Sequence, residues 1–342
     1  MVITGIIGID LGIEKTQAAY FDNTCIEPII IADCKGYGIF SESNIMEAFT
    51  DIKKKTGIDS IDAVVAVCGF FSVKQRQIIK NVGEKTGIII KRIIHKSSAA
   101  AIAHEYSLLN VQRKKERTIV SFCIEGSTLE ASVFVAGEGV LDTRNIEWDE
   151  KINYDNIDIE QINKFCQNVV SYYREIDEVI LSGNSKYLTV FQPFLIKFFG
   201  RNIINVDNSV TKGASIQGLI IKHYIKGVLL LDATNSSYAI GTYGGIMKRL
   251  IKRHTIFPTI NSVNFVIPKS NDENYHEKLL IIEEEIVPAV QNYDIGQLEL
   301  DSILSPSENE TFLEVTMGID ENNELCVSAK NINTGEIVSI KI

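Results

Sequence analysis

The stretch Lys226-Gly-Val-Leu-Leu-Leu-Asp232 separates two parts of the chain that differ in character. Its apolar run, 228–231, is too short to form a helix with a face of its own. Strand-like and helix-like runs alternate before it, whereas short strand-like runs dominate after it. A change from an α/β to an all-β pattern across a short connector predicts a domain boundary. We therefore expect a domain over 1–225, a linker over 226–232 and a second domain over 233–342.

Length and composition fit two globular domains. The chain has 342 residues, of which 45% are apolar. No run approaches the about eighteen uncharged apolar residues that a membrane span needs, and the first five residues lack the basic start of a signal peptide. Six cysteines show no Cys-x-x-Cys spacing and the five histidines are scattered. We expect a cytoplasmic protein with reduced thiols, no metal site and no membrane partner.

The net charge of −10 is unevenly distributed. Residues 1–227 contain 26 basic and 27 acidic side chains, whereas residues 228–342 contain 8 and 17. Both balances argue against nucleic acid as a partner. The basic cluster 113–117 is interpreted as a solvated loop before a strand.

The first part of the chain contains the same order of elements twice. A buried strand at 6–10, a Gly-containing turn, a returning strand at 16–20 and a third strand at 26–31 come first. They precede a helix at 44–55, a strand at 63–68 and a helix at 73–86. The order recurs from 118–134 through 179–183 to a closing helix at 208–221. A duplicated β-β-β-α-β-α unit predicts two similar halves facing a cleft, with Gly-turn amides able to bind phosphates.

Several motifs carry a family resemblance. In chain order they are Gly8-Ile-Asp-Leu-Gly12, Val73-Lys-Gln-Arg-Gln77, Thr86-Gly-Ile-Ile-Ile-Lys-Arg-Ile-Ile94, Ser98-Ala-Ala-Ala-Ile-Ala103, Gly126-Ser-Thr128, Val179-Ile-Leu-Ser-Gly183 and Gly213-Ala-Ser-Ile-Gln-Gly218. Together they resemble the nucleotide-binding domain of the seventy-kilodalton heat-shock chaperones, the DnaK-like family. The run Val228, Leu229, Leu230, Leu231 and Asp232 resembles the family's interdomain linker.

The resemblance implies an actin-like (ribonuclease H-like) domain that binds ATP with Mg²⁺. A vestigial nucleotide site would then comprise Gly8, Asp10, Gly12, Lys15, Gly126, Thr128 and Gly183. The outer lobes have no room, because about thirty residues link Ile31 to Ala63 and about forty link Phe134 to Val179, lengths typical of one or two elements.

The family's catalytic chemistry is missing at several positions. Ile13 and Glu14 replace the expected hydroxyl residues after the first turn, and Lys96 begins the segment where a catalytic Glu is expected. Cys123 replaces an Asp that orients magnesium, and Glu125 replaces a Gly that cradles phosphate. Phosphoryl transfer depends on positioned cations and donors, so we expect no catalytic residue and no useful ATP hydrolysis.

Two lysines leave nucleotide binding open. Lys15 and Lys96 could supply the positive charge that the missing lobes do not. We favour the simpler interpretation that both are exposed or are paired with Glu14 and Glu125.

The second part reads as a β-sandwich and resembles the family's peptide-binding β-domain. Strand-like runs occur at 239–243, 246–251, 264–267, 278–283, 312–319, 325–329 and 337–342. By resemblance, Ile240 and Phe265 line the pocket for one apolar side chain, and Tyr243 and Pro268 arch over an extended peptide. Without the resemblance, Ile240 and Phe265 are simply core. Either Leu279 and Ile281 or Leu280 and Ile282 face inward, and the pattern does not decide between the pairs.

We expect no helical lid, since the given chain ends at Ile342 after the last strand. The preferred interpretation is a chaperone or adaptor that binds unfolded or extended apolar peptides without an ATP cycle. By resemblance, a J-domain co-chaperone is a candidate partner. Two alternatives stay open. One is an ATP-driven chaperone with a rebuilt nucleotide site, and the other is an actin-like scaffold or assembly protein.

Overall fold

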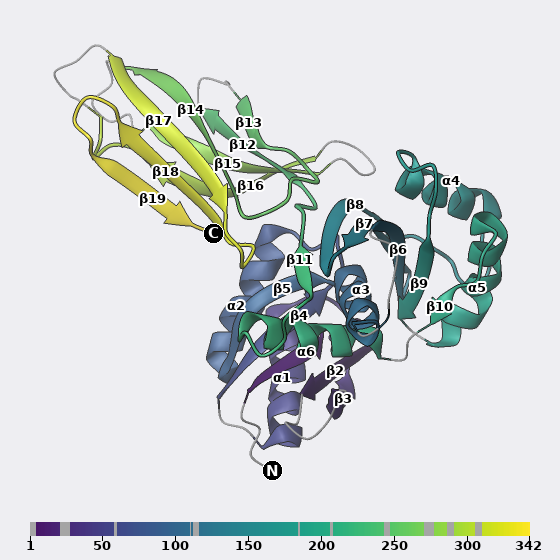
Figure 1. Cartoon of the computed structure of the whole chain (residues 1–342). Helices are drawn as coiled ribbons and strands as arrows, with labels where there is room; N and C mark the ends of the chain where they lie inside the picture. Colours follow the sequence, from purple (N-terminus) through teal and green to yellow (C-terminus); the bar gives the residue numbers. More distant parts are fainter. Residues whose placement is uncertain are drawn as a thin grey trace. The chain divides into compact units, whose positions relative to one another are not determined.

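A computed structural model describes residues 5–20, 28–57, 60–109, 111, 116–183, 185–205, 208–242, 247–269, 277–285, 291–304 and 310–342. Contacts divide the chain into two compact units. The first comprises Met1–Phe71 and Ile78–Asp232, and the second comprises Ser72–Gln77 and Ala233–Ile342. Figure 1 shows the chain with its helices and strands labelled. No helix in the described residues is long and apolar enough to cross a membrane.

The first half of the first unit contains a five-stranded sheet. Its strands lie in the order β3-β2-β1-β4-β5. The pairs β1–β2 and β2–β3 are antiparallel, whereas β1–β4 and β4–β5 are parallel. The elements are β1 (Ile6–Asp10), β2 (Lys15–Tyr20), β3 (Ile29–Lys35), α1 (Glu42–Thr56), β4 (Ile61–Val67), α2 (Val73–Thr86), β5 (Ile88–His95) and α3 (Lys96–Ser107).

The second half repeats this topology. Its sheet has the order β10-β9-β6-β7-β8-β11, so β8-β7-β6-β9-β10 corresponds strand for strand to the first sheet, with the same parallel and antiparallel pairs. The elements are β6 (Glu116–Glu125), β7 (Thr128–Gly137), β8 (Val140–Asp149), α4 (Ile159–Val170), β9 (Glu178–Gly183), α5 (Ser185–Phe199), β10 (Ile204–Asn205), α6 (Ser209–Ile221) and β11 (Leu229–Leu231). The duplicated order expected from the sequence is present.

Helices α3 and α6 lie between the two sheets (Figure 1). One apolar cluster joins the Ala-rich α3 and the facing side of α6 to residues of both sheets, such as Val64 and Phe134. A second cluster packs α1 and α2 on the far face of the first sheet, and a third packs α4 and α5 on the far face of the second sheet. The arrangement leaves the ends of the central strands facing each other across the middle of the unit.

Local sequence explains where the helices begin and end. Ser41 caps α1 by accepting a hydrogen bond from the Asn44 amide at 3.2 Å, and Gly57 ends α1 with a left-handed φ of 66°. Ile45, Ala48, Phe49 and Ile52 form the buried face of α1 at helical spacing. In the described residues between β3 and β4, α1 is the single helix.

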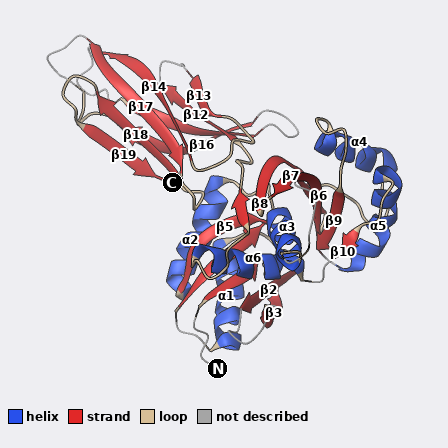
Figure 2. Cartoon of the chain, viewed as in Figure 1, coloured by secondary structure: helices blue, strands red, loops and turns tan. Residues whose placement is uncertain are grey.

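The second unit contains two four-stranded sheets, drawn in red in Figure 2. Their orders are β13-β12-β15-β16 and β14-β17-β18-β19. Apolar side chains from both sheets, including Ile240, Phe265, Ile281 and Val315, form one core cluster. The strands are β12 (Ser237–Thr242), β13 (Met247–Ile251), β14 (Thr259–Pro268), β15 (Lys278–Glu285), β16 (Gln291–Glu299), β17 (Glu310–Ile319), β18 (Leu325–Asn331) and β19 (Ile337–Lys341).

Three details differ from the sequence-based expectations or extend them. The third strand, expected at 26–31, runs from Ile29 to Lys35, and residues 26 and 27 lie outside the described part. Strand β16 was missed because its sequence is polar and interrupted by Gly296. In β15, Leu279 and Ile281 are the buried pair, which answers the register question.

Candidate functional site

A cavity of about 280 Å³ lies where the two halves of the first unit face each other. Strand ends and turns from both sheets bring polar side chains to it. Its lining comprises Asp10, Glu14, Lys15, Gln17, Lys96, Cys123, Ile124, Glu125, Gly183, Leu188, Asn205, Asn208, Ser209 and Val210. Of the predicted nucleotide-site residues, Asp10, Lys15 and Gly183 are in this lining.

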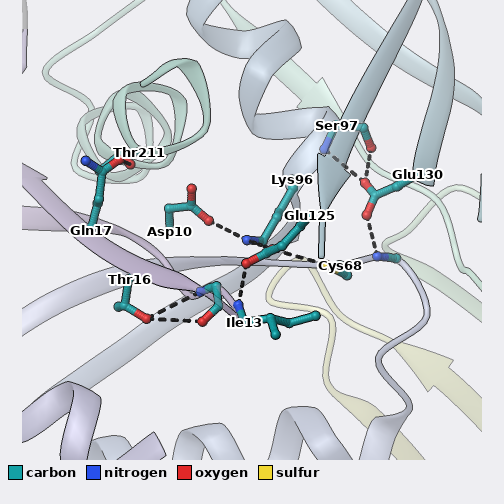
Figure 3. Close-up of polar contacts among 12 residues, drawn as sticks. Asp10, Ile13, Thr16, Gln17, Cys68, Lys96, Ser97, Glu125, Glu130 and Thr211 are labelled. Atoms are coloured by element: carbon teal, nitrogen blue, oxygen red, sulfur yellow. Dashed lines mark hydrogen bonds and ion pairs between the residues drawn. The ribbon is translucent and has the colours of Figure 1, made fainter. Parts of the chain in front are cut away.

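Lys96 stands at the start of α3 and points toward two carboxylates (Figure 3). Its Nζ lies 2.7 Å from Asp10 Oδ1 and also contacts Glu125 Oε2. The side chain is 3% exposed. Burial disfavours the ammonium form, but the negative charges of Asp10 and Glu125 outweigh it and raise the pKa of Lys96 well above its ordinary value. Lys96 is therefore a fixed positive charge inside the cavity.

Glu125 connects the second sheet to the first turn. Its Oε1 accepts a hydrogen bond from the Ile13 amide, and Cys68 Sγ lies 3.6 Å from its Oε2. A Cβ at Gly12 would collide with Glu125 Oε1 and with the Lys15 carbonyl, so the close approach requires glycine. Burial raises the pKa of Glu125 against the opposing effect of Lys96. The Ile13 amide of the first turn therefore already donates its hydrogen bond to a side chain of the same protein and not to a phosphate.

Glu130 is a second carboxylate that joins the halves, and the sequence reading did not single it out. It accepts hydrogen bonds from the Gly69 amide at 2.6 Å, from the Ser97 amide at 2.9 Å and from Ser97 Oγ. Ser97 Oγ also lies 2.7 Å from Ser132 Oγ. The signal available in the sequence was an acidic residue within an otherwise apolar strand. In the structure Glu130 is 1% exposed, and a buried carboxylate needs hydrogen-bond donors.

The remaining predicted glycines and Thr128 have structural roles. Gly8 permits close packing of β1 on α6, because a Cβ there would meet the Ser215 amide. Gly126 adopts φ 55° in the β6–β7 turn, and Gly183 allows the Ile124 backbone to approach. Thr128 is buried, and its carbonyl accepts a hydrogen bond from Tyr154 at 3.0 Å.

Lys15 and Cys123 are two further residues of the cavity lining that the sequence singles out. Lys15 is half exposed and pairs with Asp33 at 2.9 Å. Burial raises the pKa of the Cys123 thiol well above its usual range, so the thiolate that binds metals is disfavoured. Asp10, a residue of the predicted nucleotide site, forms an ion pair with Lys96.

A second acidic cluster is also filled by a cation of the chain. His104 Nε2, Glu105 and Glu178 lie close enough together to hold a metal ion. Arg117 bridges both glutamates, contacting Glu105 at 2.6 Å, while His104 lies 2.6 Å from Glu178. Because the Arg117 guanidinium already pairs with both carboxylates, we interpret this cluster as an ion-pair network between α3, β6 and β9.

The expected linker forms part of the first unit. Leu229–Leu231 is strand β11, parallel to β8. Asp232 follows with 1% exposure, and its Oδ1 lies 3.3 Å from His95 Nδ1, 3.4 Å from Ser98 Oγ and 3.5 Å from Thr143 Oγ1. Val228 and Leu230 are buried, whereas Leu229 is 47% exposed.

The predicted peptide-binding residues lie in different environments. Ile240 pairs across strands with Ile281, and both are fully buried in the core of the second unit. Phe265 is also buried, and Pro268 is exposed at the end of β14. Tyr243 lies outside the described residues.

Comparison with known proteins shows which family of proteins this chain resembles. A family model described as "Hsp70 protein" matches residues 43–174 and 162–342. The chain is 24% identical to the chaperone protein dnaK of Gracilaria tenuistipitata var. liui, over 97% of this chain and 67% of that protein. It is 26% identical to the chaperone protein dnaK of Guillardia theta, over 85% of this chain and 59% of that protein.

The mixed α/β sheets of the first unit fit an actin-like ATPase domain. The family model also matches most of the length of the chain, and the two observations together define the class of protein. The chain belongs to the Hsp70 family. The resemblance inferred from the sequence motifs is therefore confirmed.

Proposed function

We propose that this chain is an Hsp70-family chaperone or adaptor that holds extended apolar segments without hydrolysing ATP. The observation that carries the proposal is the position of Lys96 between Asp10 and Glu125. The chain provides its own cation where the family's chemistry requires Mg²⁺ and phosphate. Glu14 and Glu125 in the cavity lining add negative charge that repels a polyphosphate.

The second unit is the proposed peptide-binding part, a β-sandwich that uses no nucleotide chemistry. An extended peptide is bound in such a mode by backbone hydrogen bonds and one apolar pocket. Ile240 and Phe265 would form the floor of the pocket, with Tyr243 and Pro268 beside the peptide. Ile240 is fully buried in the core, so the proposed pocket requires a rearrangement that exposes it.

The proposed setting is the cytoplasm, and a J-domain protein is the proposed co-chaperone. The cysteines in the described part, at 34, 68, 123, 166 and 326, are free thiols. Reduced thiols are typical of that compartment. Since the proposed protein does not hydrolyse ATP, a co-chaperone could not act by stimulating hydrolysis. We expect it only to bring the protein to its peptide substrates.

Calorimetric titration with magnesium-ATP and, separately, with a labelled extended apolar peptide tests the proposal. We expect peptide binding that magnesium-ATP leaves unchanged, and no turnover of ATP with protein in excess. Tight magnesium-ATP binding would favour an ATP-driven chaperone with a rebuilt site. Concentration-dependent assembly without peptide affinity, measured by light scattering, would favour the scaffold.

Substitutions at two exposed positions on β14 test the proposed location of the peptide site. Pro268→Asp places a charge beside the proposed groove and should weaken peptide binding at least about fivefold, because apolar contact is lost. Ile260→Asp is the matched control, since Ile260 is 72% exposed toward the other end of the strand. Equal effects of the two substitutions would contradict the proposed location.

A further inference from the structure

Strand β19 is an edge strand of the second unit (Figure 1). It is the last in the order β14-β17-β18-β19, so among the described strands it has a hydrogen-bonded neighbour on one side only. The side chains of Ile337, Ser339 and Lys341 are exposed, and Ile337 is 61% exposed. Val338 and Ile340, which alternate with them, pack against the core of the unit. The strand therefore has one free side.

The hydrogen bonds between β18 and β19 show which backbone groups of β19 are free. Leu325 and Ile342 exchange two backbone hydrogen bonds, at 3.3 and 2.8 Å. In an antiparallel pair, residues alternate between hydrogen-bonded and non-hydrogen-bonded positions, and the register continues along β19 without a shift. The backbone amides and carbonyls that point away from β18 are therefore those of Ile337, Ser339 and Lys341.

Strand β19 lacks the features that protect other edges of this unit. Edge strands are commonly kept from pairing by charged side chains, proline or bulges. Strand β13 carries Lys248 and Arg249, and β14 ends at Pro268, while the pairing of β15 with β16 contains a register shift. The sequence of β19 has no proline and one charged residue, Lys341, whose ammonium already pairs with Glu324. A further strand can therefore add to this sheet.

We propose that the free edge of β19 pairs with the same edge of a second copy of this chain, antiparallel and about a two-fold axis at Ser339. The axis places Ser339 opposite Ser339 of the second copy, Ile337 opposite its Lys341, and Val338 opposite its Ile340. All the free backbone groups of the strand then have partners. Apolar side chains meet on the core side, and no two like charges are opposed.

This self-complementary register is the reason to assign a second copy as the partner. Pairing centred on Lys341 would oppose two ammonium groups, and pairing centred on Ile337 would place Lys341 opposite the turn that precedes β19. A shift by one residue would turn the core-side residues toward solvent. The two-fold axis closes the assembly at a dimer, because it uses up the free edge. Since each copy has a net charge of −10, salt should strengthen the association.

Sedimentation of the full chain over a concentration series tests for the dimer. We expect a reversible monomer–dimer equilibrium that shifts toward dimer with added salt. Ile337→Lys places an ammonium opposite Lys341 of the second copy and should weaken the dimer at least about tenfold. Ile260→Lys is the matched control, because Ile260 is 72% exposed on β14, at the opposite edge of the sheet.

A charge exchange separates lost pairing from misfolding. The double variant Ile337→Lys with Lys341→Glu should recover the dimer, because each new lysine then faces a glutamate of the other copy. Peptide titration of the same variants should be unchanged, so the proposed peptide binding stands or falls separately. Equal effects of Ile337→Lys and Ile260→Lys would overturn the proposal. A monomer at every concentration would also overturn it, whether or not β19 pairs with a strand of another protein.

Oxidative cross-linking locates the two-fold axis. In a Cys326→Ser background, Ser339→Cys should give a covalent dimer with oxidised glutathione. Two thiols form one disulfide, and the oxidant takes up two electrons and two protons and leaves as two molecules of reduced glutathione. Ser262→Cys is the control, since Ser262 is exposed on β14 at the other edge of the sheet, and it should remain monomeric. Equal cross-linking of the two variants would refute the assignment.

Discussion

Lys96 Nζ lies 2.7 Å from Asp10 Oδ1 and is buried at the start of α3. With Glu125 as its second partner, it joins three segments that come from both halves of the first unit. The cleft of this actin-like domain is thus bridged by side chains of the protein itself.

Removal of the Lys96 ammonium should be strongly destabilising. Lys96→Met leaves Asp10 and Glu125 facing each other without a cation, and breaking a buried pair in this way costs about 3–5 kcal/mol. Lys91→Met is the matched control, because Lys91 is 38% exposed and pairs with Asp62 at 3.1 Å. We expect it to cost at most about 1 kcal/mol. Urea unfolding at neutral pH measures both.

The ion-pair network around Glu178 predicts acid sensitivity. Burial raises the pKa of Glu178, but hydrogen bonds from His104 and Arg117 outweigh it and hold the pKa at about 2, below its ordinary 4.5. The stabilisation from this carboxylate is therefore complete above about pH 4.5 and is lost as pH falls toward 2.

Unfolding free energies measured from pH 6 to pH 2.5 test this dependence. Glu178→Gln should be less stable than the wild-type protein at pH 6 and should show a smaller loss on acidification. Because Glu178 is partly exposed to solvent, the difference at pH 6 is expected to be modest. Parallel curves for the two proteins would show that Glu178 is not the titrating group.

Two glycines should respond differently to alanine. At Gly12 a methyl group would collide with the Lys15 carbonyl and the Glu125 carboxylate, so Gly12→Ala should cost about 3 kcal/mol by overpacking. At Gly57 the methyl group meets open space, but the φ of 66° is left-handed. Gly57→Ala should therefore cost about 1 kcal/mol. Similar losses in thermal unfolding would contradict the steric argument at Gly12.

The sequence predicted several elements of the first unit, because apolar runs such as Ala63–Val67 and Gly turns such as Gly126 are local signals. It did not predict strand β8 or helix α4, which lie between 134 and 179. It also located the altered charges at Lys96 and Glu125. It could not show that Lys96 meets Asp10 as well, since that contact joins residues 86 positions apart through the fold. Glu130 was missed because the amides that it binds are invisible in a sequence pattern.

Asp232 should hold strand β11 on the sheet. Asp232→Ala removes the carboxylate that lies near His95, Ser98 and Thr143. The backbone hydrogen bond from the Leu229 amide to the Gly139 carbonyl, at 2.8 Å, would remain. We expect amide exchange of residues 229–231 to accelerate at least about tenfold through local opening. Lys226→Ala, at an exposed position, is the control. Unchanged exchange in both variants would mean that backbone pairing alone retains the strand.

A double-mutant cycle decides whether Lys96 and Glu125 act as one unit. Lys96→Met alone leaves two uncompensated carboxylates, and Glu125→Gln alone leaves the ammonium with Asp10. The double substitution removes one charge of each sign, so it should cost less than the sum of the single changes by about 1–3 kcal/mol. Strict additivity in urea unfolding would mean that the Lys96–Glu125 contact contributes nothing to closing the cleft. A built-in cation would then be a weaker reason to propose that the protein has no nucleotide cycle, and magnesium-ATP binding to the Lys96→Met protein would become the decisive measurement.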